Sequence, residues 1–402
     1  MEHGISTTPP GAHMNARYSF IALSLLVSAP LSLSSAAQAA NFPTLITTPL
    51  TIEGLTGDTR GNLYVPGRNA GNGAPCPVWR VNIANPSLVL VGKIPAPSAT
   101  TQCSPSGLAF DRQGRLYVTE TDKIYRFIPN DRSTPTANLF ATGVPGTNGL
   151  AFDADGNLWT GDGTTGQGRV WKIGPTGGVG VEMFRVQPMA NEVIAGGIGR
   201  DARTLPPGTI TITPTSRNAS NTAGSQPLVA NGVAFNREGD LLIADTARGA
   251  IWKVSFTSSG ALASNTGCDT TFTPNTLCLE NVFVAHPLLD GADGIALDET
   301  GNIWVSANER NAIAVVSDTG EVTEVFRNAP NATTQLRNVG PLESPASPFL
   351  SGRTLCTSNS DGNRRDNSPN TAGEITPAGP NRGKISCMDE LTNASGLPLP
   401  VR

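Results

Sequence analysis

A hairpin-like motif that recurs along the chain restricts the fold more than any other feature of the sequence. The copies are EGLTGDTRGNLYV from Glu53, SGLAFDRQGRLYV from Ser106, NGLAFDADGNLWTGDG from Asn148, NGVAFNREGDLLIADT from Asn231 and DGIALDETGNIWVS from Asp293. Each copy contains a short apolar strand, a polar turn that ends in Gly, and a second strand. Recurrence of this kind predicts a repeat architecture.

The spacing within the motif predicts how the copies are arranged. In every copy the second strand begins ten residues after the first residue of the motif. A sixth, weaker copy, SPASPFLSGRTLCTSNSDG, occupies residues 344–362, and KISCM at 384–388 is its third strand. We therefore predict an all-β fold, a six-bladed β-propeller with four-stranded antiparallel blades. In such a fold the starts of the innermost strands converge on the central axis at one face.

The ends of the chain and one long interval complete the predicted organisation. Residues 1–40 resemble a cleaved secretory signal peptide, with a basic start, an apolar core and a small-residue cleavage site. Residues 41–402 are predicted to form a single propeller domain, in which the β-type run 41–51 adds an outer strand to the last blade. Blade three carries an insertion of about residues 183–226, rich in Gly, Pro, Thr and Asn, which is either a lid over the central pocket or a surface excursion.

Composition excludes some partners. Only 15% of the residues are charged and the formal net charge is −4, so the sequence offers no basic surface for nucleic acid. We expect an exported protein, periplasmic or extracellular, with no membrane association after signal cleavage. We also expect it to act as a monomer on small molecules.

The chain contains six cysteines, an even number with no CxxC pair that would indicate zinc. Sequence alone allows fifteen pairings. The blade arrangement reduces them, because it places the members of three pairs close together. The predicted bridges are Cys76 to Cys103 at the upper face, Cys268 to Cys278 across a lower loop, and Cys356 to Cys387 on neighbouring strands of the last blade.

The first residues of the motif copies include an ordered set of oxygen-bearing side chains, each followed by Gly: Glu53, Asn148, Asn231 and Asp293. This set resembles the senescence marker protein/gluconolactonase/luciferin-regenerating enzyme family of six-bladed propellers, over the chain from Glu53 to the last blade. The resemblance implies one calcium ion at the top of the central channel, with these four residues as ligands, and calcium favours carboxylate and amide oxygens. The alternative is that each residue caps its own strand by a hydrogen bond to the backbone.

The same resemblance implies a hydrolase that acts on ester bonds, of the lactonase or esterase type. The metal polarises the carbonyl oxygen as a Lewis acid. Asp293, or a water beside it, acts as base or nucleophile, unless Asp293 serves only as a metal ligand. The competing interpretation is a non-catalytic propeller that binds a ligand or protein and uses calcium only for rigidity.

Two features restrict the chemistry further. Sugar-lactonase members of the family carry Arg-x-Asn at the start of blade two, whereas this chain has Ser104, Pro105 and Ser106. The sequence therefore predicts no guanidinium at that position and a smaller or more apolar substrate than a sugar lactone. After signal cleavage His286 is the only histidine, so a histidine pair is excluded. His286 is either a solvated or packed side chain or a pocket residue.

Overall fold

The computed structural model describes residues 40–187, 193–194, 197–198 and 230–400, except 271, 328–341 and 361–381. Ala39–Arg402 forms one compact unit. The predicted signal peptide and most of the predicted insertion lie outside the described residues. Within the described part of the chain, no helix is long and apolar enough to span a membrane.

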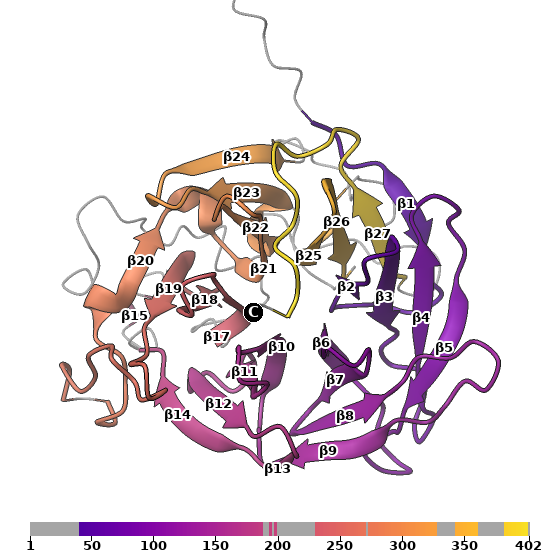
Figure 1. The fold of residues 1–402 in the computed structure, drawn as a ribbon, viewed down its shortest axis with the longest axis horizontal. Coiled ribbons are helices and arrows are strands. Elements are labelled where there is room, and N and C mark those ends of the chain that lie inside the picture. The colour runs from indigo at the N-terminus through magenta and orange to yellow at the C-terminus, as the bar shows by residue number, and fades with distance from the viewer. Residues whose placement is uncertain are drawn as a thin grey trace, which may run out of the picture. The chain divides into compact units, whose positions relative to one another are not determined.

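The strands of this unit form six small antiparallel sheets arranged in a ring, so the predicted six-bladed propeller is confirmed (Figure 1). From the axis outward, the first three blades contain β2 (Thr56–Gly57), β3 (Asn62–Pro66), β4 (Cys76–Asn82) and β5 (Val89–Ile94); β6 (Pro105–Phe110), β7 (Leu116–Glu120), β8 (Lys123–Phe127) and β9 (Asn138–Thr142); and β10 (Thr147–Phe152), β11 (Leu158–Asp162), β12 (Arg169–Ile173) and β14 (Val181–Arg185).

The second half of the ring repeats this plan. Its blades contain β17 (Ala230–Phe235), β18 (Leu241–Asp245), β19 (Ala250–Val254) and β20 (Val282–Ala285); β21 (Ala292–Leu297), β22 (Ile303–Ala307), β23 (Ala312–Val316) and β24 (Val322–Arg327); and β25 (Pro345–Ser351), β26 (Thr354–Asn359), β27 (Lys384–Cys387) and β1 (Thr44–Thr47). The shorter elements are β13 (Gly178–Val179), β15 (Val193–Ile194), β16 (Gly197–Ile198) and the 3-10 helices η1 (Leu279–Asn281), η2 (Pro287–Leu289) and η3 (Asn308–Arg310).

The first strand of the chain closes the ring, as predicted. β1 pairs antiparallel with β27 and forms the outer edge of blade six, so the two ends of the domain share one sheet (Figure 1). This pairing protects the blade edge and prevents the ring from opening between its first and last blades.

The predicted insertion begins later than residue 183. The structure places Met183, Phe184 and Arg185 in β14, where they belong to the fourth strand of blade three. Phe184 pairs with Val170 of β12 and is fully buried. Burial of this aromatic side chain against the blade explains why the strand continues past the expected boundary.

A carboxylate closes most of the hairpin turns between the first and second strands. Asp298 accepts hydrogen bonds from the backbone N–H groups of Thr300 and Asn302, both at 3.0 Å, and from Trp304 Nε1 at 3.1 Å. In earlier blades the same carboxylate and aromatic pair is Asp58 with Tyr64, Asp111 with Tyr117, and Asp153 with Trp159. The turn motif is therefore a hydrogen-bonded unit as well as a sequence of turn-forming residues.

Close contact between inner strands explains the Gly that follows the first residue of each motif copy. A Cβ atom added to Gly149 would lie 2.8 Å from the carbonyl oxygen of Asn231, and one added to Gly232 would lie 2.8 Å from Cα of Gly294. Gly54, Gly107 and Gly294 face the next blade in the same way. The strand starts therefore touch one another around the axis, and only Gly fits at these positions.

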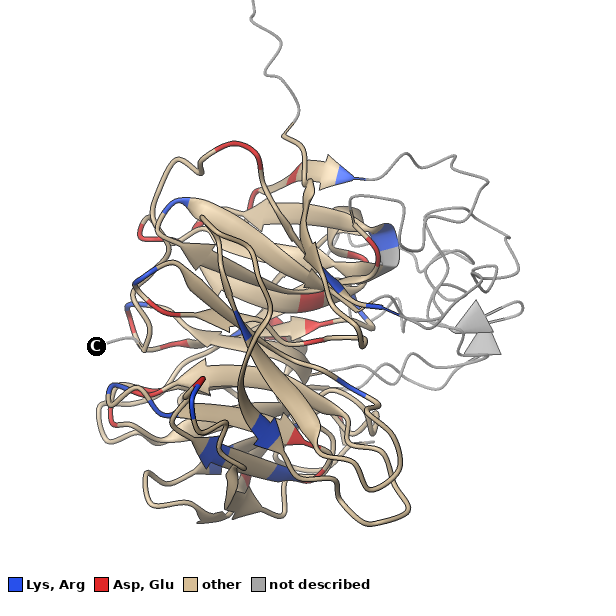
Figure 2. Cartoon of the chain, turned by 90° about the vertical axis from the view of Figure 1, so that its right-hand side faces the viewer, with Lys and Arg blue, Asp and Glu red and all other residues tan. Residues whose placement is uncertain are grey.

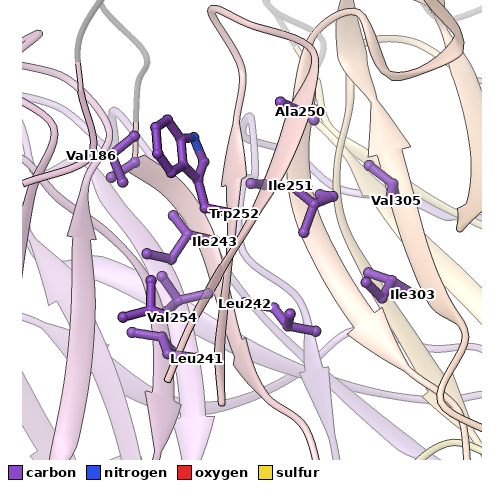
Figure 3. Close-up of a cluster of buried hydrophobic side chains, with 14 of the residues drawn as sticks. Val186, Leu241, Leu242, Ile243, Ala250, Ile251, Trp252, Val254, Ile303 and Val305 are labelled. Carbon is purple, nitrogen blue, oxygen red and sulfur yellow. The ribbon is translucent and has the colours of Figure 1, made fainter. Parts of the chain in front are cut away.

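Apolar side chains fill the space between blades. In Figure 3, Trp252 of β19 points toward Val186, whereas Ile251 points toward the strand that carries Ile303 and Val305. Successive residues of a strand face opposite sides of its sheet, so one strand packs against both neighbouring blades. In the view of Figure 2, acidic and basic residues are interspersed over the outside of the described blades.

All three predicted disulfides are present, Cys76–Cys103, Cys268–Cys278 and Cys356–Cys387. Cys356 and Cys387 occupy paired positions in β26 and β27. The last bridge therefore fixes the sheet that also contains the closing strand β1. Disulfides of this number are typical of chains that fold in an oxidising compartment.

We expect Gly232→Ala to lower the free energy of unfolding by about 1–3 kcal/mol, because the new methyl group overpacks against backbone atoms of the next blade. Gly174→Ala is the matched control, since a Cβ atom there meets nothing within 4 Å and no positive φ is required. Urea unfolding of both variants tests this. Equal stability of the two variants would contradict the contact described here.

We expect the turn carboxylate of Asp298 to make stability depend on acid. Burial alone would raise the pKa of Asp298, but the hydrogen bonds from Thr300, Asn302 and Trp304 outweigh burial and hold the pKa below its ordinary value. This stabilisation is complete above the unfolded pKa of about 3.9 and is lost as the pH falls through the folded pKa.

Asp298→Asn should therefore be less stable than the wild type at pH 7, by about 1 kcal/mol, and should lose less stability between pH 5 and pH 3. Asp318→Asn, at an exposed turn position, is the control for removal of one charge. Melting temperatures across this pH range test the expectation. Parallel pH profiles for the wild type and Asp298→Asn would show that this carboxylate contributes nothing in acid.

Candidate functional site

The four predicted ligands lie at or just before the starts of the innermost strands, positions that we call the ring. Asn148, Asn231 and Asp293 are 5%, 1% and 5% exposed, and Glu53 is half-buried. The contacts between successive inner strands connect these positions around the axis, and the Ser358 hydroxyl of blade six donates to the carbonyl oxygen of Glu53. The structure therefore brings the starts of all the blades together, as the propeller prediction requires.

Blade six contributes Ala346 to the ring. Pro345 pairs with Asn359 as Ala292 pairs with Ala307 in blade five. Ala346 is thus the counterpart of Asp293. Neither Pro345 nor Ala346 offers a side-chain oxygen, so the predicted ligand set is unchanged.

Each of the four polar ring residues lies beside the residue fifteen positions later, which comes just after the second strand of the same blade. We call these residues the ring partners. The pairs are Glu53 with Arg68, Asn148 with Gly163, Asn231 with Thr246, and Asp293 with Asn308. The sequence analysis missed this relationship, although the constant separation was visible in the aligned repeats.

Thr246 orients the amide of Asn231. The hydroxyl of Thr246 donates to the carbonyl oxygen of Ala292 at 2.6 Å, so its oxygen accepts from Asn231 Nδ2 at 3.0 Å. An amide nitrogen can only donate. Asn231 therefore keeps its Oδ1 as the atom able to bind a cation, and the same hydroxyl connects blades four and five.

Asn308 orients the carboxylate of Asp293. Asn308 Nδ2 donates to Asp293 Oδ2 at 2.9 Å, and Asn308 is only 2% exposed. Its own Oδ1 is buried and accepts no hydrogen bond within the described residues. Leaving such an acceptor unsatisfied costs about 1–3 kcal/mol, so this atom favours a donor that belongs to a ligand or to bound water.

Asn148 depends on the absence of a side chain at its ring partner. A Cβ atom on Gly163 would lie 2.8 Å from Asn148 Nδ2. The backbone carbonyl of Asn148 accepts a hydrogen bond from Thr119 at 3.2 Å. Gly163 thus provides room for the amide beside the axis, and blade two fixes its backbone.

The prediction that no guanidinium lies at the start of blade two is wrong. Arg68 of blade one reaches this position and donates to Ser104 Oγ from Nε at 3.1 Å and from Nη2 at 2.6 Å. Its Nη1 contacts Glu53 Oε2. The residues of blade two could not reveal this guanidinium, because it comes from the neighbouring blade. Its presence removes the reason to expect a more apolar substrate than a sugar lactone.

A second carboxylate lies beside Arg68. Glu120 is 1% exposed and accepts from the backbone N–H of Ser104 and from the Thr121 hydroxyl, both at 2.8 Å. Burial raises the pKa of Glu120, and its hydrogen bonds and the charge of Arg68 partly offset that effect. Arg68 therefore interacts with two acidic side chains, one in the ring and one outside it.

Apolar residues follow the ring along the same strands. The residues two positions after the ring residues are Leu55, Leu108, Leu150, Val233 and Ile295. They line a cavity of about 100 Å³ together with Leu399 and Pro400, where the C-terminal part of the chain runs to the axis (Figure 1). This apolar layer keeps water away from the side of the ring that it faces. Electrostatic interactions at the ring are therefore stronger than they would be in water.

The donor set suits calcium. It contains two carboxylates and two amides, and calcium accepts both ligand types in a flexible shell completed by water. The ring partners orient the amide of Asn231 and the carboxylate of Asp293, and the buried Asn308 Oδ1 adds an acceptor for water. Within the described residues, no three His, Cys, Asp or Glu side chains gather closely enough to hold a metal, so this centre depends on its amides.

His286 serves a local turn. It follows β20 and accepts a hydrogen bond at Nδ1 from the Leu288 backbone N–H at 3.2 Å, at the start of η2. Burial lowers the pKa of His286, and the nearby Arg310 lowers it further. The packed interpretation of His286 thus agrees with its contacts.

Comparison with known proteins decides the family. The sequence pattern of the SMP-30/Gluconolactonase/LRE-like region matches residues 78–337, more than half of the chain. The chain belongs to this family. No curated protein sequence matches it.

Two solved structures share the fold of this chain. Regucalcin from Agrobacterium tumefaciens, described as a calcium-binding protein, has a TM-score of 0.53 and 15% identity, over 90% of this chain and 97% of that protein. A luciferin-regenerating enzyme has a TM-score of 0.51 and 12% identity, over 89% and 97%. At these identities the likeness shows only a common fold. It gives no information about the chemistry of the ring residues in this chain.

We expect Thr246→Val to lower the free energy of unfolding by about 1–3 kcal/mol, because Asn231 Nδ2 and the Ala292 carbonyl both lose their partner in a buried place. Thr323→Val is the matched control, since Thr323 is exposed on the outer strand β24. Denaturant unfolding measures both. A neutral Thr246→Val would mean that this hydroxyl does not hold the ring.

Proposed function

We propose that the protein is an exported, calcium-dependent hydrolase that cleaves ester bonds in small molecules, of the lactonase or esterase type. The observation that carries the proposal is the oxygen ring, in which buried amide and carboxylate groups from separate blades are oriented by their ring partners. Membership of a family that includes gluconolactonases supports hydrolysis in general.

The residues that would hold calcium are Glu53, Asn148, Asn231 and Asp293. When bound there, calcium supplies Lewis-acid polarisation of a substrate carbonyl. The two carboxylates compensate its charge, and the apolar layer along the channel makes their attraction stronger than in water.

Asp293 is the residue that we assign to proton transfer. Asn308 Nδ2 donates to its Oδ2 and orients the carboxylate, which would accept a proton from an attacking water. The unsatisfied Asn308 Oδ1 lies on the same side chain and would accept a second hydrogen bond from such a water. These two acceptors orient the water, and Asp293 alone takes up its proton.

Three disulfides support folding in an oxidising compartment, which agrees with an exported chain and with cleavage of residues 1–40. We propose a periplasmic or extracellular monomer that acts on an ester or lactone. The guanidinium of Arg68 beside the ring also makes substrates with a polar or anionic group compatible with the site.

Calcium removal and one substitution test the function. Chelation of the mature, oxidised protein should lower its melting temperature, and calcium should restore it, because a ligand that binds only the folded state stabilises it. Asp293→Ala should bind calcium at least tenfold more weakly and lose hydrolysis of aryl acetates and lactones by about 10²-fold or more.

Ser106→Ala is the matched control, because Ser106 occupies the ring position of blade two and is not a proposed ligand. It should keep calcium binding and hydrolysis. Bound calcium without hydrolysis of any aryl ester, lactone or phosphoester would leave the binding propeller as the better interpretation. Full activity of Asp293→Ala would contradict the assigned proton transfer.

A further inference from the structure

The residue fifteen positions after Glu53 is a cation, Arg68. Asn231 and Asp293 contact a hydroxyl and an amide, whereas Glu53 contacts the guanidinium of Arg68. The two side chains are 15% and 26% exposed, so their attraction is only partly screened by solvent. The protein therefore already compensates the charge of this proposed ligand.

We propose that Arg68 and a divalent cation compete for the Glu53 carboxylate, so that the affinity of the ring for calcium is set by the guanidinium that must release Glu53. This inference rests on the proposed calcium site. It adds a residue that tunes the metal without binding it.

The contacts of Arg68 make such an exchange feasible. Ser104 Oγ accepts from two of its nitrogens, Nε and Nη2, and these bonds do not involve Glu53. Glu120 lies close enough to feel the charge of Arg68 and stays beside Ser104 through the Ser104 backbone N–H. Arg68 therefore keeps a hydrogen-bond acceptor and a nearby carboxylate after Glu53 has turned to the metal.

Two physical effects act in the same direction. The ion pair must be broken before Glu53 can serve as a ligand, and the remaining guanidinium repels a doubly charged cation beside it. In the metal-free protein, Arg68 compensates the negative charge of the half-buried Glu53 carboxylate. Arg68 thus stabilises the metal-free ring and weakens calcium binding, which are opposite effects on two measurable quantities.

The test is calorimetric titration of the mature, oxidised protein with calcium chloride, together with melting temperatures in a chelator. Arg68→Met should lower the Kd for calcium by about fivefold to twentyfold, since each 1.4 kcal/mol of lost competition is tenfold. It should also melt several degrees lower than the wild type without metal. Arg68→Lys keeps the charge and loses the paired hydrogen bonds to Ser104. Its Kd and its melting temperature should lie between those of the wild type and Arg68→Met.

Arg169→Met is the matched control for loss of one cation at this face. Arg169 pairs with Asp162 at 2.8 Å, with side chains 17% and 0% exposed, and Asp162 is not a ring residue. This variant should melt lower and keep the wild-type Kd within about twofold.

The outcomes separate the inference from the proposed function. Tighter binding in Arg68→Met with an unchanged Kd in Arg169→Met supports the competition. Equal or weaker binding in Arg68→Met overturns it and leaves the calcium site of the wild type intact. If Arg68→Met binds calcium and the wild type does not, the competition is supported and the calcium dependence of the wild type is overturned. If neither protein binds calcium, both the competition and the proposed calcium dependence are overturned.

Discussion

The structure depends on the contact between inner strands at the propeller axis. Each blade brings a backbone segment to this axis, and a Cβ atom on Gly149 or Gly232 would lie under 3.0 Å from the next blade. Glycine allows the strands to touch, and touching strands place the preceding side chains around one point. The same steric requirement therefore builds both the narrow centre of the fold and the ring of oxygens.

The ring is shaped further by the segment that leaves each second strand. The residue fifteen positions after a ring residue returns to the axis and orients it, through a hydroxyl at Thr246 and an amide at Asn308. The backbone geometry is repeated, but the side-chain chemistry changes from blade to blade. A symmetrical scaffold thus produces an asymmetrical site, with carboxylates at Glu53 and Asp293 and amides between them.

The two carboxylates of the ring have different ring partners. Asp293 accepts from a neutral amide, whereas Glu53 contacts the guanidinium of Arg68, which Ser104 holds in place. Neutral donors orient an oxygen without opposing a metal, and a cation opposes it directly. In the proposed calcium site, the ring would therefore contain both the groups that attract the ion and one group that limits how strongly it binds.

The sequence by itself determined the repeat, the six blades, the closing strand and the three disulfides, because these follow from periodic strands and turns and from the fixed order of blades. It also predicted Glu53, Asn148, Asn231 and Asp293 as one ligand set, which stays a prediction. Only the tertiary structure placed Arg68 against Ser104, since that contact joins two blades, and only it showed that β14 continues through Arg185. Periodicity records where a backbone repeats, whereas the direction of a long side chain is decided by the neighbours that it meets after folding.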